Sequence, residues 1–556
     1  MNSEKNLSVD LFYPSREKKE KLKERRRALS QLPQDYIADM EAERIAAMLS
    51  PDNPSVVMKL IGEMCTDPDV INYRLDALED VLAMPRLSPT IHKIVRTIFD
   101  NERVNVSNLS SPDTFAALSA HISALDTFAD CMEMLHSYYE EEGKNVKSEA
   151  MKSLFGYFEE IYASQDYADM KTDLADLKDA FSKRIRCVTV AINFNEEMRP
   201  VSAGVVGWSN TAATEKPSVF ERILYRNAKY ADVNVKNLHT RYLDDNNREP
   251  NDVDKALFTE LEKITSEYMG RLNRAMNDYK CISFNELRGV DEQLNFYDNA
   301  AKQVELAKAK GLKMCRPVLL PEEDRAADIK GLFDLCFFRK AAAADSNKTG
   351  DSLVVVNDIE MNDNARFYLL SGANNGGKTT FTRAVGTCHI LVQLGLYAPA
   401  AECRISPVDF IYTHFPKEEE VGINSSRFTT EIKELKTISD TITDRCLLLM
   451  NESIQSTTPA ECMEIAAEIV RIFTIIGARG LFATHLTGLA KMTDEFNSDP
   501  DNRSKTDSLV VCVDESTGER IYRIKRGLPG ESSYASVIFQ KYGISADEIR
   551  RRAAGK

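Results

Sequence analysis

The chain has 556 residues, more than one hydrophobic core usually serves, so we expect two or more domains. Its 71 basic and 86 acidic side chains give a formal net charge of −15, which excludes a surface coated in basic charge and makes any nucleic-acid contact local. The 11 cysteines include no C-x-x-C pair, which predicts a reduced protein without structural zinc. Without a long apolar run or a signal peptide, we expect a cytoplasmic protein with no membrane contact.

The first part of the chain is predicted to be helical. Residues 16–27 hold eight basic and three acidic side chains, which indicates a solvated helix or arm over 1–35; a phosphate-contacting arm is the alternative. Apolar residues then recur at helical spacing to about residue 183, as at Ile71, Leu75 and Leu78. We therefore predict a helical core or lever over 36–185.

The spacing of apolar residues changes from a helical to a strand pattern after this region. Residues 187–194 and 201–206 predict two strands of a hairpin, the centre of a clamp-like insertion over 186–250. Basic and tyrosine side chains follow between Arg222 and Tyr242, a pattern of either a solvated helix face or a DNA-binding patch. An apolar stripe from Leu257 to Tyr279 predicts a long returning lever helix.

A polar, small-residue segment at 341–350 predicts a linker. The returning lever and linker therefore occupy 251–350, and a final domain covers 351–556.

The final domain carries a phosphate-binding motif. An apolar run at 367–370 precedes a loop that fits G-x-x-x-x-G-K-[ST], and a helical pattern follows. Backbone N–H groups of such a loop surround phosphate oxygens, Lys378 adds a charge, and the Thr379 hydroxyl can ligate Mg²⁺. A chance glycine-rich turn is the alternative. The predicted nucleotide-binding residues are Gly372, Ala373, Asn374, Asn375, Gly376, Gly377, Lys378, Thr379 and Thr380.

Further motifs downstream fit a nucleotide-hydrolysing site. Residues 445–452 form a buried-strand pattern that ends in Asn451 and Glu452, where P-loop ATPases place a metal-holding Asp and a water-polarising Glu. Asn451 can still accept a hydrogen bond from metal-bound water, without the charge of an Asp. Thr458 and Glu461 form a capping box at the start of the next helix.

Two residues have alternative interpretations from sequence alone. His485 ends a short apolar strand, where it is either a structural residue or a contact for the γ-phosphate or water. Ser426 precedes a predicted helix, where it is either an ordinary cap or a phosphate contact.

Together these motifs resemble, in order and spacing, the ATPase domain of the MutS DNA mismatch repair family. The matching segments are residues 372–379, 426–431, 449–452, 482–485 and 530–535, and the resemblance extends more loosely to residues 67–74 and to the hairpin. It implies a multidomain fold: an all-α core and lever region with a small β clamp insertion, followed by an α/β P-loop domain of ABC-like fold. It also implies a homodimer with two composite ATP sites and clamps around DNA.

The resemblance assigns roles by position. Lys378 and Thr379 would hold phosphate and Mg²⁺, Asn451 would lie at the metal, and Glu452 would activate water. Asn374 would contact phosphate, His485 would sense the γ-phosphate, and Ser426 would reach the nucleotide of the partner subunit.

The chain also departs from the family pattern. Helical core sequence begins within about 40 residues, so we expect no mismatch-recognition or connector domain, and we also expect no appended nuclease module. The Asn-Glu pair is similar to that of short MutS relatives. Between Val354 and Asn357, where repair proteins have an aromatic that stacks on adenine, this chain has valines, which predicts looser adenine recognition.

The leading hypothesis is therefore an ATP-hydrolysing dimer that acts on DNA structure, in repair or recombination, with other repair proteins as possible partners. The alternative is a non-hydrolysing, nucleotide-gated clamp, which Asn451 favours and Glu452 and His485 oppose. An SMC or ABC-type ATPase unrelated to MutS is disfavoured, because there is no LSGGQ-like signature and too few residues for a coiled-coil arm lie between Thr379 and Glu452.

Overall fold

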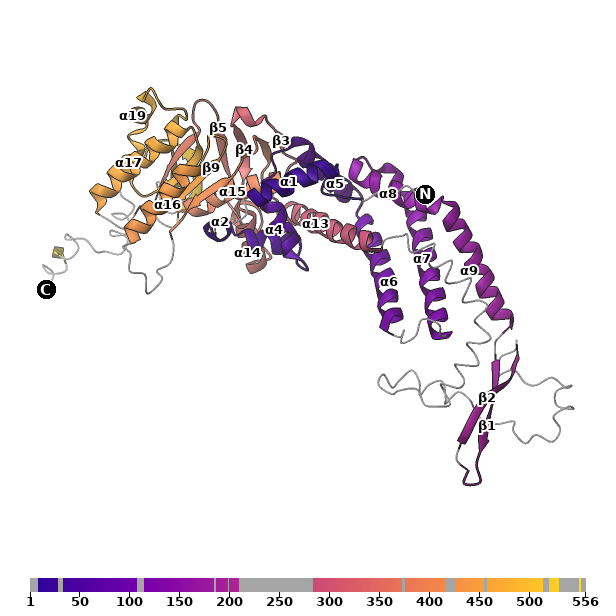
Figure 1. Ribbon diagram of the computed structural model, residues 1–556. Helices are drawn as coiled ribbons and strands as arrows, with labels where there is room; N and C mark the ends of the chain where they lie inside the picture. The colour runs from indigo at the N-terminus through magenta and orange to yellow at the C-terminus, as the bar shows by residue number, and fades with distance from the viewer. Residues whose placement is uncertain are drawn as a thin grey trace. The chain divides into compact units, whose positions relative to one another are not determined.

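The computed structural model describes residues 9–28, 34–107, 115–184, 187–198, 200–209, 284–372, 376–416, 427–454, 458–513, 520–529 and 550–551. The chain divides into two compact units (Figure 1). One unit consists of Met1–Leu7, Pro89–Asn145 and Phe155–Arg288, and the other of Ser8–Ser88, Val146–Leu154 and Gly289–Lys556. The predicted basic and tyrosine-rich segment and the predicted apolar stripe at 257–279 lie outside the described residues.

The described residues of the first unit form helices and a hairpin. Tyr167 donates a hydrogen bond to the Ala129 carbonyl and so joins two of its helices. The hairpin strands pair antiparallel from Cys187 opposite Ser209 to Phe194 opposite Pro200, which confirms the predicted hairpin. The elements, some of which run into the second unit, are α6 (Leu87–Ser107), α7 (Phe115–Glu141), η1 (Gly143–Asn145), α8 (Glu149–Tyr162), α9 (Gln165–Arg184), β1 (Cys187–Phe194) and β2 (Pro200–Ser209).

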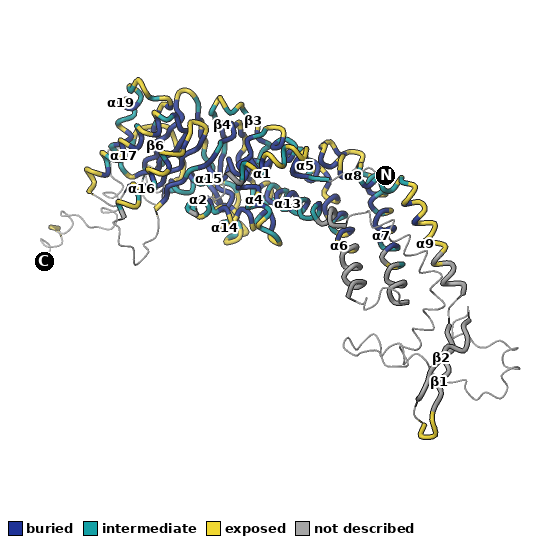
Figure 2. The backbone as a smooth tube through the Cα atoms, in the orientation of Figure 1, coloured by how far each residue is buried: buried dark blue, intermediate teal, exposed yellow. Residues whose placement is uncertain are grey.

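A six-stranded sheet forms the centre of the second unit, with strand order β12-β11-β6-β10-β9-β8. Neighbouring strands are parallel except for β11 and β12, which are antiparallel. The interior strands β6, β9 and β10 are buried along their whole length, which explains their continuous apolar sequences (Figure 2). The strands are β6 (Phe367–Ser371), β8 (Ile411–His414), β9 (Leu447–Asn451), β10 (Arg479–Thr484), β11 (Thr506–Val513) and β12 (Arg520–Arg526).

A second, four-stranded sheet has the order β3-β7-β4-β5. Its strands are β3 (Val318–Leu319), β4 (Ala327–Leu332), β5 (Asn357–Met361) and β7 (Glu402–Ile405). Because β4 pairs with β5, the two sides of residue 350 belong to one sheet. The segment predicted as a linker is also structured: Ala341–Ala344 form the last turn of a helix whose first turn is capped by the Asp334 carboxylate. The compact unit therefore extends upstream of the predicted boundary.

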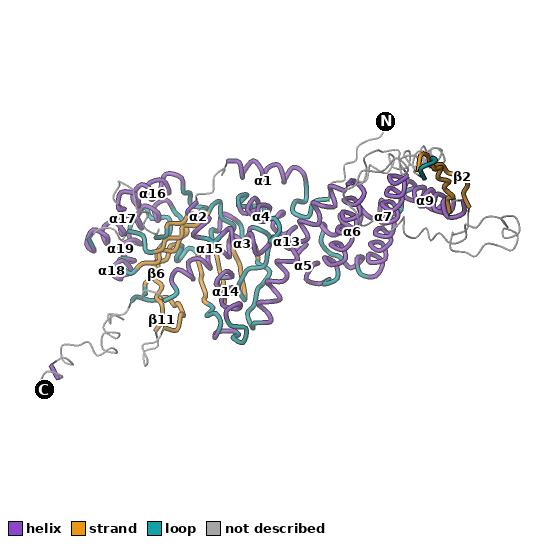
Figure 3. The backbone as a smooth tube through the Cα atoms, turned by 90° about the horizontal axis from the view of Figure 1, so that it is seen from below, coloured by secondary structure: helices purple, strands orange, loops and turns teal. Residues whose placement is uncertain are grey.

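Helices flank the strands of this unit (Figure 3). Helix α15 packs against β9 and β10, and α2 and α16 pack against β8. The helices are α1 (Arg16–Ala28), α2 (Gln34–Asp39), α3 (Ala42–Leu49), α4 (Pro54–Ile61), α5 (Pro68–Ala83), α13 (Phe284–Ala309), η2 (Glu322–Asp324), α14 (Leu335–Ala344), η3 (Gly350–Ser352), α15 (Lys378–Gln393), α16 (Arg427–Thr441), α17 (Pro459–Ile476), α18 (Thr487–Ala490) and α19 (Thr493–Ser498).

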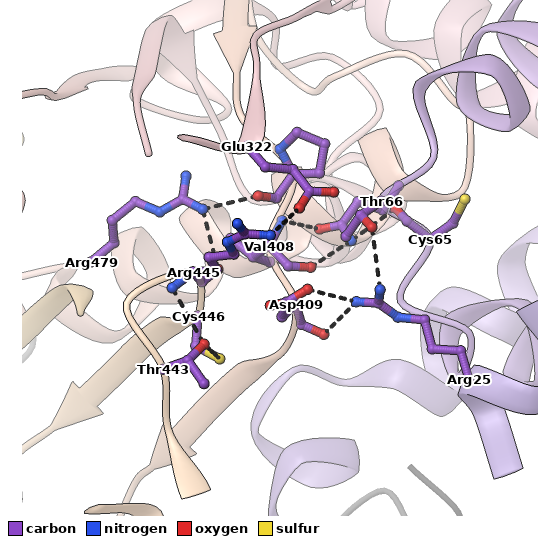
Figure 4. Close-up of polar contacts among 12 residues, drawn as sticks. Arg25, Cys65, Thr66, Glu322, Val408, Asp409, Thr443, Arg445, Cys446 and Arg479 are labelled. Carbon is purple, nitrogen blue, oxygen red and sulfur yellow. Dashed lines mark hydrogen bonds and ion pairs between the residues drawn. The ribbon is translucent and has the colours of Figure 1, made fainter. Parts of the chain in front are cut away.

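The basic N-terminal helix is attached to this unit by its charges. Arg25 donates to the Asp409 carboxylate at 3.0 Å and to the Thr66 hydroxyl at 3.2 Å (Figure 4). Lys18 pairs with Asp67 at 2.9 Å, and Leu22 is buried. Several charges of the predicted arm therefore pair within the chain.

Figure 4 also shows how the amino ends of the parallel strands are held. The buried Arg479 side chain donates to the carbonyls of Ser406 and Pro407 at 3.1 and 2.9 Å. Burial lowers the pKa of Arg479 to about 10. These bonds join β10 to the loop before β8 on the edge of the sheet opposite the carboxyl ends of its strands. Within the described part of the chain, no helix combines the length and apolar character needed to cross a membrane.

Candidate functional site

The predicted phosphate and water-activating residues meet at the carboxyl ends of three parallel strands. In the register of the sheet, Ser371 on β6 lies opposite Thr484 on β10, and Ala483 on β10 lies opposite Asn451 on β9. The residues that follow each strand, among them Glu452, therefore share one edge of the sheet. This edge is the usual place for ligands in open α/β sheets.

Two glycines of the motif are required by their surroundings. A Cβ atom at Gly372 would lie 2.7 Å from Cβ of Val511 on β11, so the close approach of β6 and β11 excludes a side chain there. Gly377 has a φ of +89° and precedes the first residue of α15, and a Cβ there would lie 3.3 Å from the Tyr522 ring. Ala373, Asn374 and Asn375 lie outside the described residues.

Lys378 is the first residue of α15, and its side chain is only 3% exposed. Its Nζ donates to the Gly372 carbonyl at 2.8 Å and lies 3.5 Å from Oε1 of Glu452. Burial lowers the pKa of the Lys378 ammonium, and the nearby Glu452 carboxylate opposes that shift. The site thus contains a buried cation with two partners at the same edge of the sheet. The Gly372 carbonyl follows β6, and the Glu452 carboxylate follows β9.

The two predicted metal ligands are in direct contact. Thr379 Oγ1 donates to Oδ1 of Asn451 at 3.1 Å. A hydroxyl and an amide carbonyl are oxygen ligands, the type that Mg²⁺ prefers, and Glu452 adds a carboxylate one residue later. The donor set therefore fits Mg²⁺ chemically, although it carries one charge fewer than an Asp-Glu pair.

A cavity of about 600 Å³ opens beside these residues. Part of its lining is polar and comes from the first turn of α15 and from Glu452, and part is apolar and aromatic. The lining residues used below are Asp334, Phe337, Val354, Lys378, Glu452 and Tyr522.

Two exposed aromatic side chains in this lining were not predicted from the sequence. Tyr522 on β12 and Phe337 on α14 are 45% and 44% exposed. Asn357 on β5 holds β12 in place, because its side chain donates to the Tyr522 carbonyl at 3.1 Å and accepts from the Ile524 N–H at 2.7 Å. The alternating pattern of residues 520–526 would have indicated a strand, but not the strand's place beside the glycine loop. The cavity therefore has aromatic faces although Val354 and its neighbours have none.

Asp334 is a second lining residue that sequence reasoning missed. Its carboxylate accepts a hydrogen bond from the Phe337 N–H at 2.9 Å, and the residue is 5% exposed. Burial raises the pKa of Asp334 to about 6. A titrating carboxyl thus lies in the wall of the cavity.

The remaining predicted residues are placed differently. His485 follows β10 at the same edge of the sheet, but it is exposed and does not line the cavity. Gly376 and Thr380 lie at the phosphate motif, and Thr380 lines the cavity. Ser426 lies outside the described residues.

Two family models match separate segments of the chain. MutS domain V matches residues 368–540, and the MutS2 N-terminal domain matches residues 66–305. The first of these matches covers the sheet edge described above.

Individual relatives agree with the domain matches. The chain is 22% identical over 530 residues to a DNA mismatch repair protein MutS of Caldanaerobacter subterraneus subsp. tengcongensis, and 27% identical over 302 residues to that of Thermosipho melanesiensis. It is 24% identical over 501 residues to the DNA mismatch repair protein Msh6 of Gallus gallus. These alignments cover 90%, 54% and 81% of this chain, but only 56%, 32% and 37% of the relatives.

The mixed α/β unit, with helices flanking a largely parallel sheet, is consistent with a MutS-like α/β domain. With matches to both a MutS domain and a MutS2 domain, and with MutS and Msh6 relatives along most of its length, the chain belongs to the MutS family.

Proposed function

We propose that this protein binds ATP with Mg²⁺ in the cavity beside α15, hydrolyses it, and couples hydrolysis to DNA binding. The observation that carries the proposal is the convergence of Lys378, Thr379, Asn451 and Glu452 on one sheet edge, beside a cavity with aromatic walls. The MutS and Msh6 names of the relatives support the DNA component.

In this proposal each side chain has one task. The Lys378 ammonium exchanges its Glu452 partner for oxygens of the β- and γ-phosphates, which are stronger anionic partners. Thr379 and Asn451 would hold Mg²⁺, which would supply positive charge beside the phosphates. Glu452, released from Lys378, orients a water molecule and accepts its proton. Tyr522 and Phe337 offer flat apolar faces to the adenine base.

The assembly is also part of the proposal. We infer a homodimer of ABC-like P-loop units in which Ser426 reaches the partner's nucleotide and His485 senses the γ-phosphate from the edge of the sheet. The helical lever and the hairpin would engage double-stranded or branched DNA, in repair or recombination. Other repair proteins are the expected partners.

A non-hydrolysing, nucleotide-gated clamp is the second candidate. It is favoured by Asn451, which supplies no charge to the metal, and by the contact between Lys378 and Glu452, which occupies the proposed base. In that case ATP binding alone would change the conformation of the protein.

The test is steady-state, Mg²⁺-dependent ATP hydrolysis at one salt concentration without DNA and with homoduplex, mismatched duplex or four-way junction. We expect turnover that responds most to the junction and falls at least 100-fold in Glu452→Ala, since a general base contributes about 10²–10⁴-fold. Lys378→Ala should lose ATP binding, whereas Lys59→Ala, which removes an exposed lysine on α4, should not. ATP binding without turnover would favour the clamp, and unchanged ATP affinity in Lys378→Ala would contradict the assigned site.

A further inference from the structure

The turn that carries Glu452 has an unfavourable backbone. Glu452 and Ile454 have φ angles of +50° and +63°, in the left-handed region that residues with a Cβ atom seldom adopt and that is least favourable for a β-branched side chain. Such conformations persist where the surrounding structure fixes them, and they concentrate at functional sites. The contacts that hold this turn therefore bear on the position of the Glu452 carboxylate.

Two sets of contacts hold the turn. The Glu452 N–H donates to the Ala483 carbonyl at 2.7 Å. Ser453, between the two strained residues, is 4% exposed, and its hydroxyl donates to the His414 carbonyl at 3.0 Å. The same Oγ lies 2.7 Å from Nδ1 of the His414 ring. Both the backbone carbonyl and the side chain of His414, at the end of β8, thus form hydrogen bonds with the turn.

The hydrogen-bond geometry indicates which ring nitrogen carries a proton. The carbonyl can only accept, so the serine proton points to it, and Nδ1–H of His414 must then donate to the serine oxygen. The other ring nitrogen, Nε2, lies 3.5 Å from Oε2 of Glu434 on α16. The ring is 6% exposed and is therefore held between β8, α16 and the Glu452 turn.

We infer that His414 is a positioning residue for ATP hydrolysis: through Ser453 it fixes the strained turn so that the Glu452 carboxylate faces the phosphate loop. This inference rests on the proposed hydrolytic function. Glu452 lies 3.5 Å from Lys378 with its backbone in this conformation. If the His414–Ser453 contact were lost, the turn could relax to a common conformation, and the carboxylate would move away from the reacting phosphate.

A positioning role and a purely structural role differ in what they change. A buried polar pair that only stabilises the fold affects the unfolding temperature and leaves the turnover of folded protein unchanged. Loss of a pair that positions the base lowers kcat. It leaves ATP affinity nearly unchanged, because Lys378 and Thr379 are not part of the pair. Asn can present its amide N–H near the location of Nδ1, so His414→Asn should restore part of the loss.

The experiment compares kcat, KM and the Kd for Mg²⁺-ATP in wild type, His414→Ala, His414→Asn and Ser453→Ala. We expect kcat to fall about tenfold in His414→Ala and Ser453→Ala, with Kd within about twofold of wild type, as for loss of one oriented contact of roughly 1.4 kcal/mol. His414→Asn should recover at least half of the loss on a logarithmic scale. The double variant should be no slower than Ser453→Ala, because that change already removes the contact with the His414 ring.

The matched control is His136→Ala, which removes another histidine–carboxylate pair, to Glu159 at 3.0 Å on helices of the other unit, and should leave kcat unchanged. If His414→Ala does not fold, Ser453→Ala, which deletes a single oxygen atom, decides the question. Wild-type kcat in the folded variants, or a parallel loss of ATP binding, would overturn the positioning role while the ATPase function stands. A wild type that binds ATP without turnover would overturn both.

Discussion

A buried lysine needs polar or anionic partners within the protein. Lys378 finds the Gly372 carbonyl and the Glu452 carboxylate, so the cation and the proposed base neutralise each other. In the proposed mechanism, ATP must break this pair before Glu452 can act on water. The proposal therefore predicts that nucleotide binding and activation of the base are coupled through one exchange of side-chain partners.

Asp334 provides a prediction on the pH dependence of stability. Its folded-state pKa of about 6 lies above the ordinary value, so the folded protein binds the proton more tightly than the unfolded chain does. Stability contributed by this carboxyl is full below about pH 4 and is lost as the pH rises to about 6. Asp334→Asn, which stays neutral and can still cap α14, should gain up to roughly 2–3 kcal/mol relative to wild type across that window.

The check is the thermal unfolding midpoint of both proteins between pH 4.5 and 7. The difference between variant and wild type should grow with pH. Asp345→Asn, at the half-exposed other end of the same helix, is the control and should follow wild type. Parallel curves for Asp334→Asn and wild type would contradict the assigned pKa.

The site was predictable from sequence where each residue follows a locally recognisable apolar strand, and unpredictable where a residue reaches the site only through strand pairing. Lys378, Thr379, Asn451 and Glu452 follow strands whose apolar runs are recognisable locally, and the structure brings them together as expected. Tyr522 reaches the same cavity through the pairing of β12 with β11, which no local pattern encodes.

At the scale of elements, the strongest local signals were also the most reliable. The buried runs of β6, β9 and β10 and the hairpin of β1 and β2 were predicted and are found. The four-stranded sheet was missed, because β3 has only two residues and both partners of β4, β5 and β7, follow the polar segment at 341–350. That segment was interpreted as a linker because small residues are common to linkers and to helix ends such as that of α14.

The start of α17 gives a prediction at this scale. Thr458 accepts from the Glu461 N–H, and Glu461 Oε2 accepts in return from the Thr458 N–H at 3.3 Å, as the sequence predicted. Thr458→Ala should destabilise this first turn by about 1 kcal/mol, and Thr458→Ser should not. The measurement is hydrogen exchange of the amides of residues 460–463, which should speed up about fivefold in Thr458→Ala alone. Equal exchange in the two variants would show that the cap does not stabilise the helix.

At the scale of the whole molecule, the proposed dimer makes a prediction about shared sites. If Ser426 completes the partner's site, a heterodimer of Ser426→Ala and Glu452→Ala subunits has one intact site and one doubly defective site. Random mixing of two inactive variants should then restore about a quarter of wild-type turnover, provided that sites work independently.

The control for this experiment is a mixture of Lys378→Ala and Glu452→Ala subunits. Both changes then affect the subunit's own site, so every site is defective and no turnover should return. Restoration in this control as well would point to residual parental activity. Absence of any gain in the Ser426 mixture would count against a site shared between subunits.

The three-segment construction of the sheet-bearing unit has a consequence for synthesis on the ribosome. Leu11 bonds through its N–H to Gln293, and Arg25 pairs with Asp409, partners 282 and 384 residues downstream. At roughly 5–20 residues per second, Arg25 emerges some 20–80 s before Asp409 exists. Until α13 is made, Leu11 and Phe12, buried in the finished protein, lack the side chains of Gln293 and Phe296 that they contact. The nascent amino-terminal segment therefore exposes apolar side chains while most of its own unit is still to be synthesised.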